Sequence, residues 1–513
     1  MAAVNVANML RVHRARRPDH EALVDGDLRL TYEELDKAVD RHARALRDAG
    51  VGRGDIVAIL ARNHATYLIE IFALYRLGAV QLPLNWRLHH RELDYIVSHA
   101  GATTLLVDEE FEDKAAELET LERVITHGAG GRFPALADLV AAAPDEPVED
   151  ADVELDDLAR ILYTSGTTSR PKGVMHTYQN LHFNQYMQML ELGLTPADRI
   201  LLTGPLFHVA GLDAPGHGTL SIGATLVVSP TFKGPDIVRL AAAERATGMV
   251  LAAQILYDIL DFEQLGDYDL SSLRYVIFAG VPVVDRQRFH EAFPGVRGID
   301  TFGMTEITSA ACYLDERNQI SKIGSQGPAV PFCDVKIVGP DGEELPPGRV
   351  GEIAVRGPKV MKGYWRDPEA TAEALRDGWL HTGDMASIDE DGYMWFADRK
   401  RDMIRSGGEN IASAEIERVI AKLPNVAEVA VIGVPDPKWD EVPKAYVIPR
   451  GALTADDVLA HCREHLGKFK VPKYVEIVDD LPRNDSGKVL KRLLEDPSAG
   501  ERVAALNARE EQA

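Results

Sequence analysis

Short apolar runs and amphipathic stretches alternate along the first 110 residues of the chain. Ile56-Val57-Ala58-Ile59-Leu60 is an apolar run, residues 65–77 follow with helical spacing, and residues 79–82 are apolar again. Residues 91–100 and 104–107 repeat this order. Strand-length runs that alternate with helical segments predict βαβ units around a mostly parallel sheet.

The same patterns continue to about residue 280. Residues 158–163 are predicted to form a strand, and residues 178–191 a helix that follows a turn rich in Gly, Thr and Ser. Three more apolar runs predict buried strands over residues 226–229, 249–252 and 275–278.

The pattern changes after residue 330. Strand patterns at residues 335–338 and 352–356 flank Pro340-Asp341-Gly342, which indicates a small antiparallel sheet or barrel. Five consecutive charged residues at 398–402 are expected to form an exposed junction. Beyond them, helices are predicted over residues 414–422 and 454–466, and strands over residues 426–433, 444–448 and 474–478.

These patterns predict an α/β protein of two domains joined by an exposed junction. The N-terminal domain, residues 1–397, combines βαβ-rich sheets with a small barrel-like subdomain, and the junction covers residues 398–402. Residues 403–513 are predicted to form a small α+β domain.

Charge and composition narrow the range of partners. The chain has 56 Lys and Arg against 80 Asp and Glu, a net charge of −24, which repels nucleic acid and anionic membranes. A local pocket for a small anionic cofactor is still allowed. The three Cys are scattered, so a reducing cytoplasm is the expected location. The most apolar stretch, residues 67–84, is broken by Glu70, Arg76 and Pro83, and no membrane segment is expected.

The densest chemical signal is Thr164-Ser165-Gly166-Thr167-Thr168-Ser169-Arg170-Pro171-Lys172-Gly173. Between a predicted strand and a predicted helix, its hydroxyls, backbone N–H groups and Lys172 are expected to wrap the oxygens of a polyphosphate. It is not the loop GxxxxGK[ST], because Lys172 precedes Gly173 and no Ser or Thr follows. A polar surface turn is the alternative interpretation.

This stretch resembles the signature loop of the adenylate-forming superfamily of acyl-CoA synthetases, peptide-synthetase adenylation domains and firefly luciferase. Other motifs follow in that family's order: Pro205-Leu206-Phe207-His208, Thr301-Phe302-Gly303-Met304-Thr305-Glu306, Gly378-Trp379-Leu380-His381-Thr382-Gly383-Asp384, Asp398-Arg399-Lys400-Arg401-Asp402, Ser406-Gly407-Gly408-Glu409-Asn410-Ile411 and Pro482-Arg483-Asn484-Asp485-Ser486-Gly487-Lys488. Chance does not produce such an ordered set. The resemblance is closest to free-standing fatty-acid or aryl-acid CoA ligases.

The resemblance implies how ATP and magnesium are bound. Thr164, Ser165, Gly166, Thr168 and Lys172 are expected to hold the nucleotide phosphates. Glu306 matches the magnesium ligand, and a hard carboxylate oxygen suits a metal that also holds substrate phosphates. A Glu306 that only caps a helix over residues 307–311 is the alternative.

It also implies the ribose and adenine contacts. Asp384 is expected to chelate both ribose hydroxyls beside Arg399, although a simple turn role for Asp384 is the alternative. The adenine slot is expected along Gly280, Val281 and Pro282 and along Thr301, Phe302, Gly303, Met304 and Thr305, where Gly admits a flat ring and Phe302 can stack. Ala279, Val281 and Ser169 depart from the family's usual residues, and Val281 is expected to narrow the substrate pocket.

The expected catalytic residues are Lys488, His208 and Thr167. The family places the Lys between the carboxylate and the α-phosphate, where it stabilises the charge that develops during adenylation. His208 matches a His beside the carboxylate pocket, with Asp213 close by. A solvated lysine and a satisfied core histidine are the alternatives for Lys488 and His208.

The second half-reaction is expected to involve the C-terminal domain. The family rotates this mobile domain about a hinge at Arg401, which withdraws Lys488 and brings Gly407 and Gly408 to the site, where they leave room for the pantetheine arm. Trp439 matches a residue near the CoA nucleotide. Lys468, Lys470 and Lys473 are expected to receive the CoA phosphates, with a solvated patch as the alternative.

The resemblance therefore implies an acyl-CoA synthetase that uses ATP, Mg2+ and CoA. A carboxylic acid and ATP give acyl-AMP and pyrophosphate, and CoA then gives acyl-CoA and AMP. Another acceptor is the first alternative: carrier-protein pantetheine, an amine, or activation of nitrite for diazotisation. A regulatory protein without turnover is disfavoured, because Thr167, Glu306, Asp384 and Lys488 are all present. An apolar pocket for a medium-chain or aryl acid is expected after His208, and a homodimer is compatible with the sequence.

Overall fold

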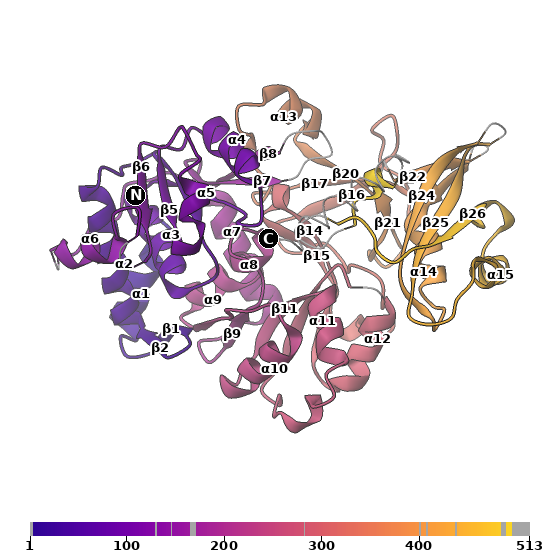
Figure 1. The fold of residues 1–513 in the computed structure, drawn as a ribbon, viewed down its shortest axis with the longest axis horizontal. Coiled ribbons are helices and arrows are strands. Elements are labelled where there is room, and N and C mark those ends of the chain that lie inside the picture. The colour runs from indigo at the N-terminus through magenta and orange to yellow at the C-terminus, as the bar shows by residue number, and fades with distance from the viewer. Residues whose placement is uncertain are drawn as a thin grey trace. The chain divides into compact units, whose positions relative to one another are not determined.

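The computed structural model describes residues 4–494 except 129–130, 145, 165–170, 282, 400–401, 407–408, 437–438 and 484–488. The chain folds into two compact units (Figure 1). The first unit comprises Met1–Val335, Ala354–His381 and Gly392–Met394. The second unit comprises Lys336–Ile353, Thr382–Asp391 and Trp395–Ala513.

The first seven-stranded sheet of the first unit has the strand order β18-β8-β7-β4-β3-β5-β6. Its β7, β4, β3, β5 and β6 are mutually parallel, and β8 is antiparallel to both β7 and β18. The strands are β3 (Ile56–Leu60), β4 (Val80–Pro83), β5 (Thr104–Val107), β6 (Arg123–Thr126), β7 (Leu158–Thr164), β8 (Lys172–Thr177) and β18 (Gly363–Tyr364).

The second seven-stranded sheet has the order β13-β12-β11-β9-β10-β1-β2, and only β2 runs antiparallel to its neighbour. Its strands are β1 (Glu21–Asp25), β2 (Leu28–Thr31), β9 (Arg199–Leu202), β10 (Thr225–Val228), β11 (Gly248–Ala252), β12 (Tyr275–Ala279) and β13 (Arg297–Ile299). A hairpin of β14 (Thr301–Met304) and β15 (Ser309–Tyr313) follows, connected by the single 3-10 turn η4 (Thr305–Ile307).

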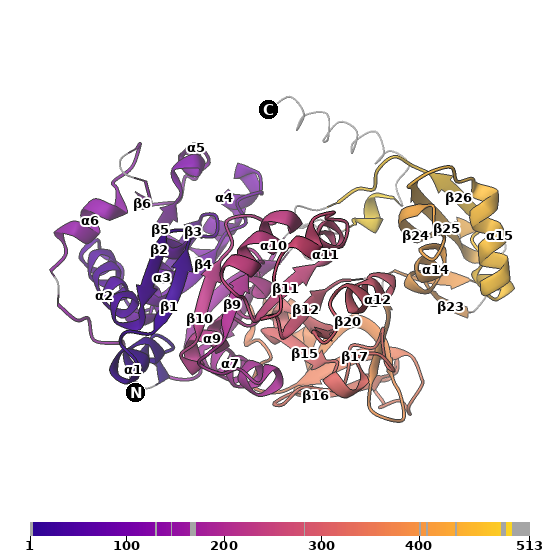
Figure 2. The ribbon, with the colours of Figure 1, turned by 90° about the horizontal axis from the view of Figure 1, so that it is seen from below.

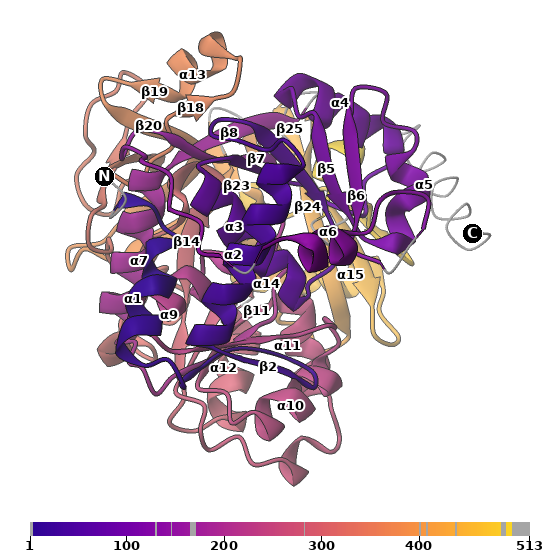
Figure 3. The same ribbon diagram turned by 90° about the vertical axis from the view of Figure 1, so that its left-hand side faces the viewer.

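Helices cover both sheets. Their bounds are α1 (Asn8–Arg16), α2 (Tyr32–Asp48), α3 (Ala65–Leu77), α4 (His90–Ala100), α5 (Glu112–Ala115), α6 (Leu136–Ala142), α7 (Tyr178–Leu192), α8 (Val209–Leu212), α9 (Gly216–Ile222), α10 (Gly234–Ala243), α11 (Ala253–Leu260), α12 (Val283–Ala292) and α13 (Pro368–Ala374). One core lies between α4 and strands β3, β4 and β5. A second core lies where α10, α11 and α12 pack on β11 and β12 (Figure 2). Helices α2 and α3 lie side by side (Figure 3), and α3 is buried on nearly every side.

The second unit contains most of the remaining elements. A five-stranded sheet is formed by β16 (Asp334–Val338), β17 (Gly351–Arg356), β19 (Leu375–Arg376), β20 (Trp379–Ile388) and β21 (Met394–Arg399). The boundaries between the two units fall within or beside strands of this sheet. A second sheet is formed by β22 (Met403–Ser406), β23 (Glu409–Ala412), β24 (Val426–Asp436), β25 (Asp440–Pro449) and β26 (Tyr474–Ile477), with α14 (Ser413–Ile420) and α15 (Ala455–His465).

The α/β fold class is confirmed, and one local prediction is wrong. The phosphate-loop stretch does not lie between a strand and a helix: Thr164 and Lys172 are paired in the β7–β8 hairpin, and α7 begins only at Tyr178. The reason is that residues 172–177 pair antiparallel with β7, an interaction between strands that the local pattern does not reveal. The domain boundaries at residues 397 and 403 stay predictions. Among the described helices, none combines the length and apolar character needed to cross a bilayer.

Candidate active site

Strand β8 supports the part of the site that contains Lys172. Tyr364 of β18 lies opposite Val174 of β8, and Lys172 is two residues from Val174, so the two side chains are diagonal neighbours on one face. The Lys172 ammonium lies 5.0 Å from the centre of the Tyr364 ring. The predicted phosphate residues Ser165, Gly166, Thr167 and Thr168 lie outside the described residues, but Thr164 and Lys172 on their flanks face each other.

Tyr364 connects this lysine to Glu306. Its hydroxyl donates a hydrogen bond to Glu306 Oε1 at 2.9 Å. Burial, and then the Glu306 carboxylate, raise the pKa of Tyr364 well above its usual range, so the phenol keeps its proton and donates. The structure therefore brings together Lys172 and Glu306, two residues expected from the sequence, through a tyrosine that the sequence reasoning missed.

Glu306 lies in the η4 turn and is 8% exposed. Strand β15 begins at Ser309, so Glu306 precedes no helix and the helix-cap alternative is wrong. A Cβ on Gly303 would lie 2.1 Å from the Ser309 carbonyl oxygen, so only glycine allows β14 to approach β15 this closely. The Glu306 carbonyl accepts from the Met361 N–H at 2.8 Å, which ties the turn to the segment before β18.

A chain of buried polar side chains supports the same turn from the other side. His176 Nε2 lies 2.7 Å from the Thr305 carbonyl oxygen, and its Nδ1 lies 2.9 Å from Arg160 Nη2. Because Arg can only donate, His176 Nδ1 must accept and Nε2 must donate to Thr305. Burial and then the Arg160 charge lower the pKa of His176 to about 3, so the ring stays neutral.

Arg160 is in turn fixed by Asp213, which lies at the C-terminal end of α8. The guanidinium and the carboxylate meet at 2.7 Å, and His217 Nδ1 lies 3.0 Å from Asp213 Oδ1. Burial raises the pKa of Asp213, but Arg160 and His217 outweigh it and hold that pKa well below its usual range. Asp213 is fully buried and ion-paired, so its role is to hold Arg160 in place.

His208 is positioned at the start of α8. Its Nδ1 accepts from the Ala210 N–H at 3.1 Å, which leaves Nε2 as the ring atom able to donate to an acid. Asn63 holds the preceding segment by two bonds, donating to the Gly204 carbonyl at 2.8 Å and accepting from the Leu206 N–H at 2.9 Å. His208 is exposed, which does not fit the core-histidine alternative.

The expected adenine segment follows the end of β12. Gly280 adopts a φ of +68° and has open space at its Cβ position, as expected of a residue against which a flat ring can lie. Val281 is 2% exposed and packs in the core under α10, α11 and α12. This placement argues against the expectation that Val281 narrows the substrate pocket. Pro282 lies outside the described residues.

The β14 part of that slot is less open. Phe302 is buried opposite Cys312, whereas Thr301 and Met304 are half-buried, Gly303 is exposed and Thr305 is buried. Asp300, just before this segment, pairs with Arg286 at 2.7 Å. Burial raises the pKa of Asp300 to about 7 against the opposing effect of Arg286.

Asp384 belongs to the second unit. It lies within strand β20, so the simple-turn alternative is not what the structure shows. Thr382 Oγ1 donates to the Ile353 carbonyl at 2.9 Å and accepts from the Asp384 N–H at 3.1 Å. Gly383 N–H donates to Glu352 at 3.0 Å. Arg399 ends β21, and its side chain lies outside the described residues.

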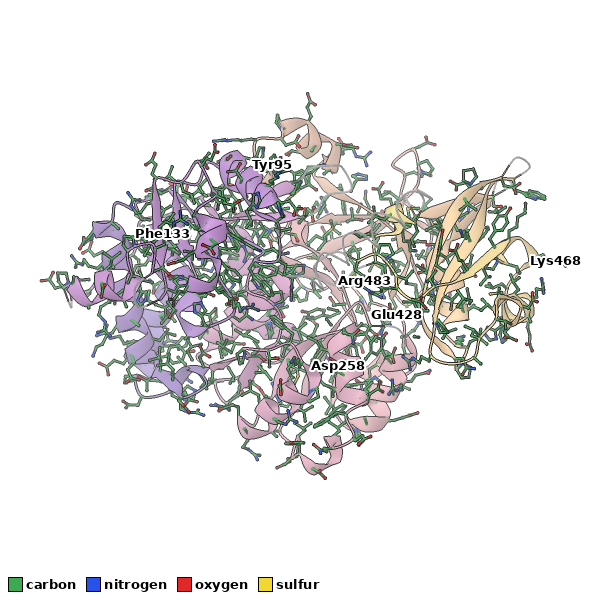
Figure 4. The ribbon with its side chains drawn as sticks, viewed as in Figure 1. Tyr95, Phe133, Asp258, Glu428, Lys468 and Arg483 are labelled. Atoms are coloured by element: carbon green, nitrogen blue, oxygen red, sulfur yellow. The ribbon has the colours of Figure 1, made fainter. Side chains whose placement is uncertain are left out.

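The residues expected to bind CoA lie at the surface of the second unit. Trp439 is 45% exposed, and its N–H donates to Asp436 at 3.1 Å. Asp436 also forms an ion pair with Lys473, and Glu415 pairs with Lys470 at 2.7 Å. Lys468 is exposed (Figure 4). Two of the three expected phosphate-binding lysines are therefore already paired with carboxylates.

The flanks of Lys488 are also described. Arg483 pairs with Val489 across the segment that carries Lys488, and the Leu490 N–H donates to the Pro482 carbonyl at 2.7 Å. Arg483 forms an ion pair with Glu428 (Figure 4). Likewise, Ser406 and Glu409 pair on either side of Gly407 and Gly408. Lys488, Gly407, Gly408 and Arg401 themselves lie outside the described residues.

The expected exposed junction at residues 398–402 needs a correction at Asp398. This carboxylate is buried, and it accepts from Ser413 Oγ at 2.6 Å and from the Ala414 N–H at 3.2 Å. It accepts from one N–H group in the first turn of α14, which is why this residue is buried although it lies in a run of charges.

A separate cluster of His64, Asp108 and His127 brings ligand-type atoms within 4.8 Å of one another. His64 Nδ1 accepts from the Tyr67 N–H at 3.1 Å, so its proton is on Nε2, which donates to Asp108 at 2.9 Å and cannot ligate a metal. His127 faces Asp108 and Glu70 at 2.7 Å each. Burial lowers the pKa of His127, but the two carboxylates outweigh it and raise the value to about 10. The cluster is therefore an ion network rather than a metal centre.

Glu306 is chemically suited to magnesium. Mg2+ in nucleotide sites usually takes one or two protein carboxylates and completes its shell with water and phosphate oxygens. A single buried carboxylate near a lysine that flanks a hydroxyl-rich loop matches this requirement.

The comparisons agree with this geometry. The family model described as AMP-binding enzyme matches residues 10–365, and the model of its C-terminal domain matches residues 415–488. A feruloyl-CoA synthase of Amycolatopsis sp. is 43% identical over 484 residues, 94% of this chain and 96% of the relative. An indoleacetate–CoA ligase of Aromatoleum aromaticum is 37% identical over 93% of this chain and 95% of its own length.

A solved structure supports the same conclusion. The o-succinylbenzoate CoA synthetase of Bacillus subtilis, in complex with its acyl-adenylate intermediate, superposes with a TM-score of 0.87 at 33% identity. The match covers 95% of this chain and 98% of that enzyme, which has also been solved with ATP and a magnesium ion. Because the motif order, both family models and relatives of nearly full length coincide, this chain belongs to the AMP-binding enzyme family of adenylate-forming ligases.

Proposed function

We propose that this enzyme activates an aromatic carboxylic acid as acyl-AMP and transfers the acyl group to CoA. The acid–thiol ligase class expected from the sequence agrees with the relatives, which are named as CoA synthases or ligases. The sequence left medium-chain and aryl acids open. The aromatic choice is supported by relatives named for ferulate, indoleacetate and succinylbenzoate.

The observation that carries the proposal is the contact chain from Lys172 through Tyr364 to Glu306, at the base of the hydroxyl-rich loop. Attack of a carboxylate on the α-phosphorus builds negative charge on phosphoryl oxygens, and catalysis requires positioning and positive charge. Lys172 supplies one such charge, and Glu306 would hold Mg2+, which neutralises phosphate charge when bound. His208 Nε2 is placed to donate to the acid.

Residues of the second unit are assigned to both half-reactions. Lys488 is proposed to act at the α-phosphate, Asp384 and Arg399 at the ribose, and Trp439, Gly407 and Gly408 along the CoA path. Rotation about residues 398–402 would exchange Lys488 for the glycine pair. A homodimer and a cytoplasmic location stay predictions.

The acceptor can be tested directly. Purified enzyme is incubated with ferulic acid, ATP and Mg2+, with and without CoA, and pyrophosphate, AMP and thioester are measured. We expect equal amounts of AMP and CoA thioester when CoA is present. Pyrophosphate release without thioester would contradict the proposal and favour carrier-protein pantetheine, an amine or nitrite chemistry.

A further inference from the structure

Tyr364 is the described residue that touches both Lys172 and Glu306. We propose that Tyr364 is a positioning residue for the metal and the phosphates: its hydroxyl orients the Glu306 carboxylate toward the metal, and its ring supports Lys172. This inference rests on the proposed function, because it takes Glu306 as the metal ligand. It assigns Tyr364 no direct contact with the reacting atoms.

The backbone of Tyr364 is fixed on three sides. Strand β18 pairs with β8, and the following Trp365 N–H donates to the Gly173 carbonyl at 2.7 Å. Tyr364 N–H donates to Thr371 Oγ1 at 2.9 Å. A Cβ on Gly363, whose φ is +147°, would lie 2.7 Å from Thr371 Cγ2. The ring is therefore attached to the strand that begins with Lys172.

The hydroxyl end acts on one oxygen of Glu306. A carboxylate that accepts a hydrogen bond on Oε1 loses rotational freedom, so its orientation toward a metal is set before the metal binds. The Met361 and His176 contacts fix the backbone of the same turn. Tyr364 fixes the side chain, which those backbone contacts do not reach.

The ring face acts on Lys172. A lysine ammonium 5.0 Å from an aromatic centre is within the range of a cation–π interaction. The long lysine side chain has many conformations, and this contact favours those in which the ammonium lies on the Glu306 side of β8. One tyrosine thus places two groups of opposite charge around one phosphate site.

The test compares ATP binding with and without metal. Calorimetry measures the dissociation constant of ATP in Mg2+ and in EDTA. The metal factor is the dissociation constant in EDTA divided by that in Mg2+. Glu306→Gln should lower this factor most, and Tyr364→Phe should lower it roughly tenfold, as loss of a partner of a metal ligand typically does. Tyr364→Leu should in addition weaken metal-free ATP binding roughly threefold, because Lys172 loses its support.

Tyr32→Phe is the matched control. Its hydroxyl is also buried and donates to the Ala224 carbonyl at 2.7 Å, in the helix layer of α2. It should leave the metal factor unchanged. Thr371→Val removes the oxygen that accepts from Tyr364 N–H and should lower the factor roughly threefold, which keeps the proposal testable if Tyr364→Phe is not recovered folded.

Three outcomes would contradict the inference or one of its two parts. If Glu306→Gln lowers the metal factor but Tyr364→Phe or Thr371→Val matches the wild type, Tyr364 does not position the ligand. If Glu306→Gln also matches the wild type, the metal assignment falls together with the inference. Thioester formation by the wild-type enzyme, measured in parallel, tests the proposed function separately. Equal ATP binding by Tyr364→Leu and Tyr364→Phe in EDTA would refute the support of Lys172.

Discussion

The residues assigned to the two half-reactions are held in different ways. In the first unit, Glu306 is 8% exposed and its turn is fixed by Tyr364, Met361 and His176. In the second unit, Trp439 is 45% exposed, and its backbone N–H donates to the buried Asp436, which forms an ion pair with the exposed side chain of Lys473. Charge stabilisation requires donors fixed in advance, whereas a residue that receives CoA after the first step can adapt. The first unit should therefore hold the metal and the phosphates for adenylation, whereas the second unit should contribute to adenylation through Lys488 and Asp384 and to the use of CoA through Trp439.

The largest expected effect is on the rate of acyl-AMP formation, and it separates the two half-reactions. Lys488→Ala should slow acyl-AMP formation roughly a hundred- to a thousand-fold, because one charge donor at the transition state is lost. Thioester formation from supplied acyl-AMP should survive, since that step needs no charge at the attacked α-phosphate. Pyrophosphate bursts and single-turnover thioester assays measure the two steps. Equal slowing of both would mean that one conformation serves both reactions.

Asp384→Ala should have the next largest effect. Two charge-assisted hydrogen bonds to the ribose are worth about 1.5–3 kcal/mol each, so the KM for ATP should rise by roughly a hundredfold. The KM for the acid should stay close to the wild-type value. An unchanged KM for ATP would remove Asp384 from the ribose site.

Trp439→Ala should have a smaller and more selective effect. Loss of an exposed aromatic contact, worth about 0.5–1.5 kcal/mol, should raise the KM for CoA by roughly two- to tenfold. The first-turnover release of pyrophosphate should not change. Tyr474→Ala, another exposed aromatic of the second unit, is the control. A fall in pyrophosphate release would mean that Trp439 also takes part in adenylation.

The smallest expected effect on catalysis concerns the ion network of His127. Its folded-state pKa of about 10 exceeds the usual value near 6.5, so its stabilisation is complete below pH 6.5 and is lost as pH rises toward 10. Urea unfolding from pH 6 to 10 should show this loss in the wild type and not in His127→Gln. His465→Gln, at an exposed histidine, should behave as the wild type. A pH dependence that His127→Gln retains would assign it to other groups.

Local patterns were sufficient for many elements. β3, α3 and β5 begin and end where their apolar periodicity predicts. The sequence did not predict strand β8, because this strand follows a Gly- and Ser-rich stretch and is formed by pairing with β7. It did not predict the Tyr364–Glu306 contact either, because β18 pairs with β8 from a distant part of the chain. Pairing between distant strands leaves no periodic signal in the sequence.

The order of the motifs predicted the candidate site residues, but not the buried residues that hold them in place. Lys172, Glu306 and His208 were expected as functional residues, and the structure shows Glu306 in a turn between two strands and His208 exposed at a helix start. Asp213 was expected only to lie close to His208, and the buried contacts that join it to Arg160 and His176 were not expected, because single polar residues in apolar runs give no indication of their partners.

The central claim is that this enzyme is a CoA ligase for aromatic acids. The most direct measurement is kcat/KM for CoA thioester formation across hydroxycinnamic, arylacetic and benzoic acids and saturated acids of medium chain length. The account predicts that the best aromatic acid exceeds every saturated acid by about tenfold or more, equivalent to about 1.4 kcal/mol at the transition state. A saturated acid that equals or exceeds the best aromatic acid would contradict it.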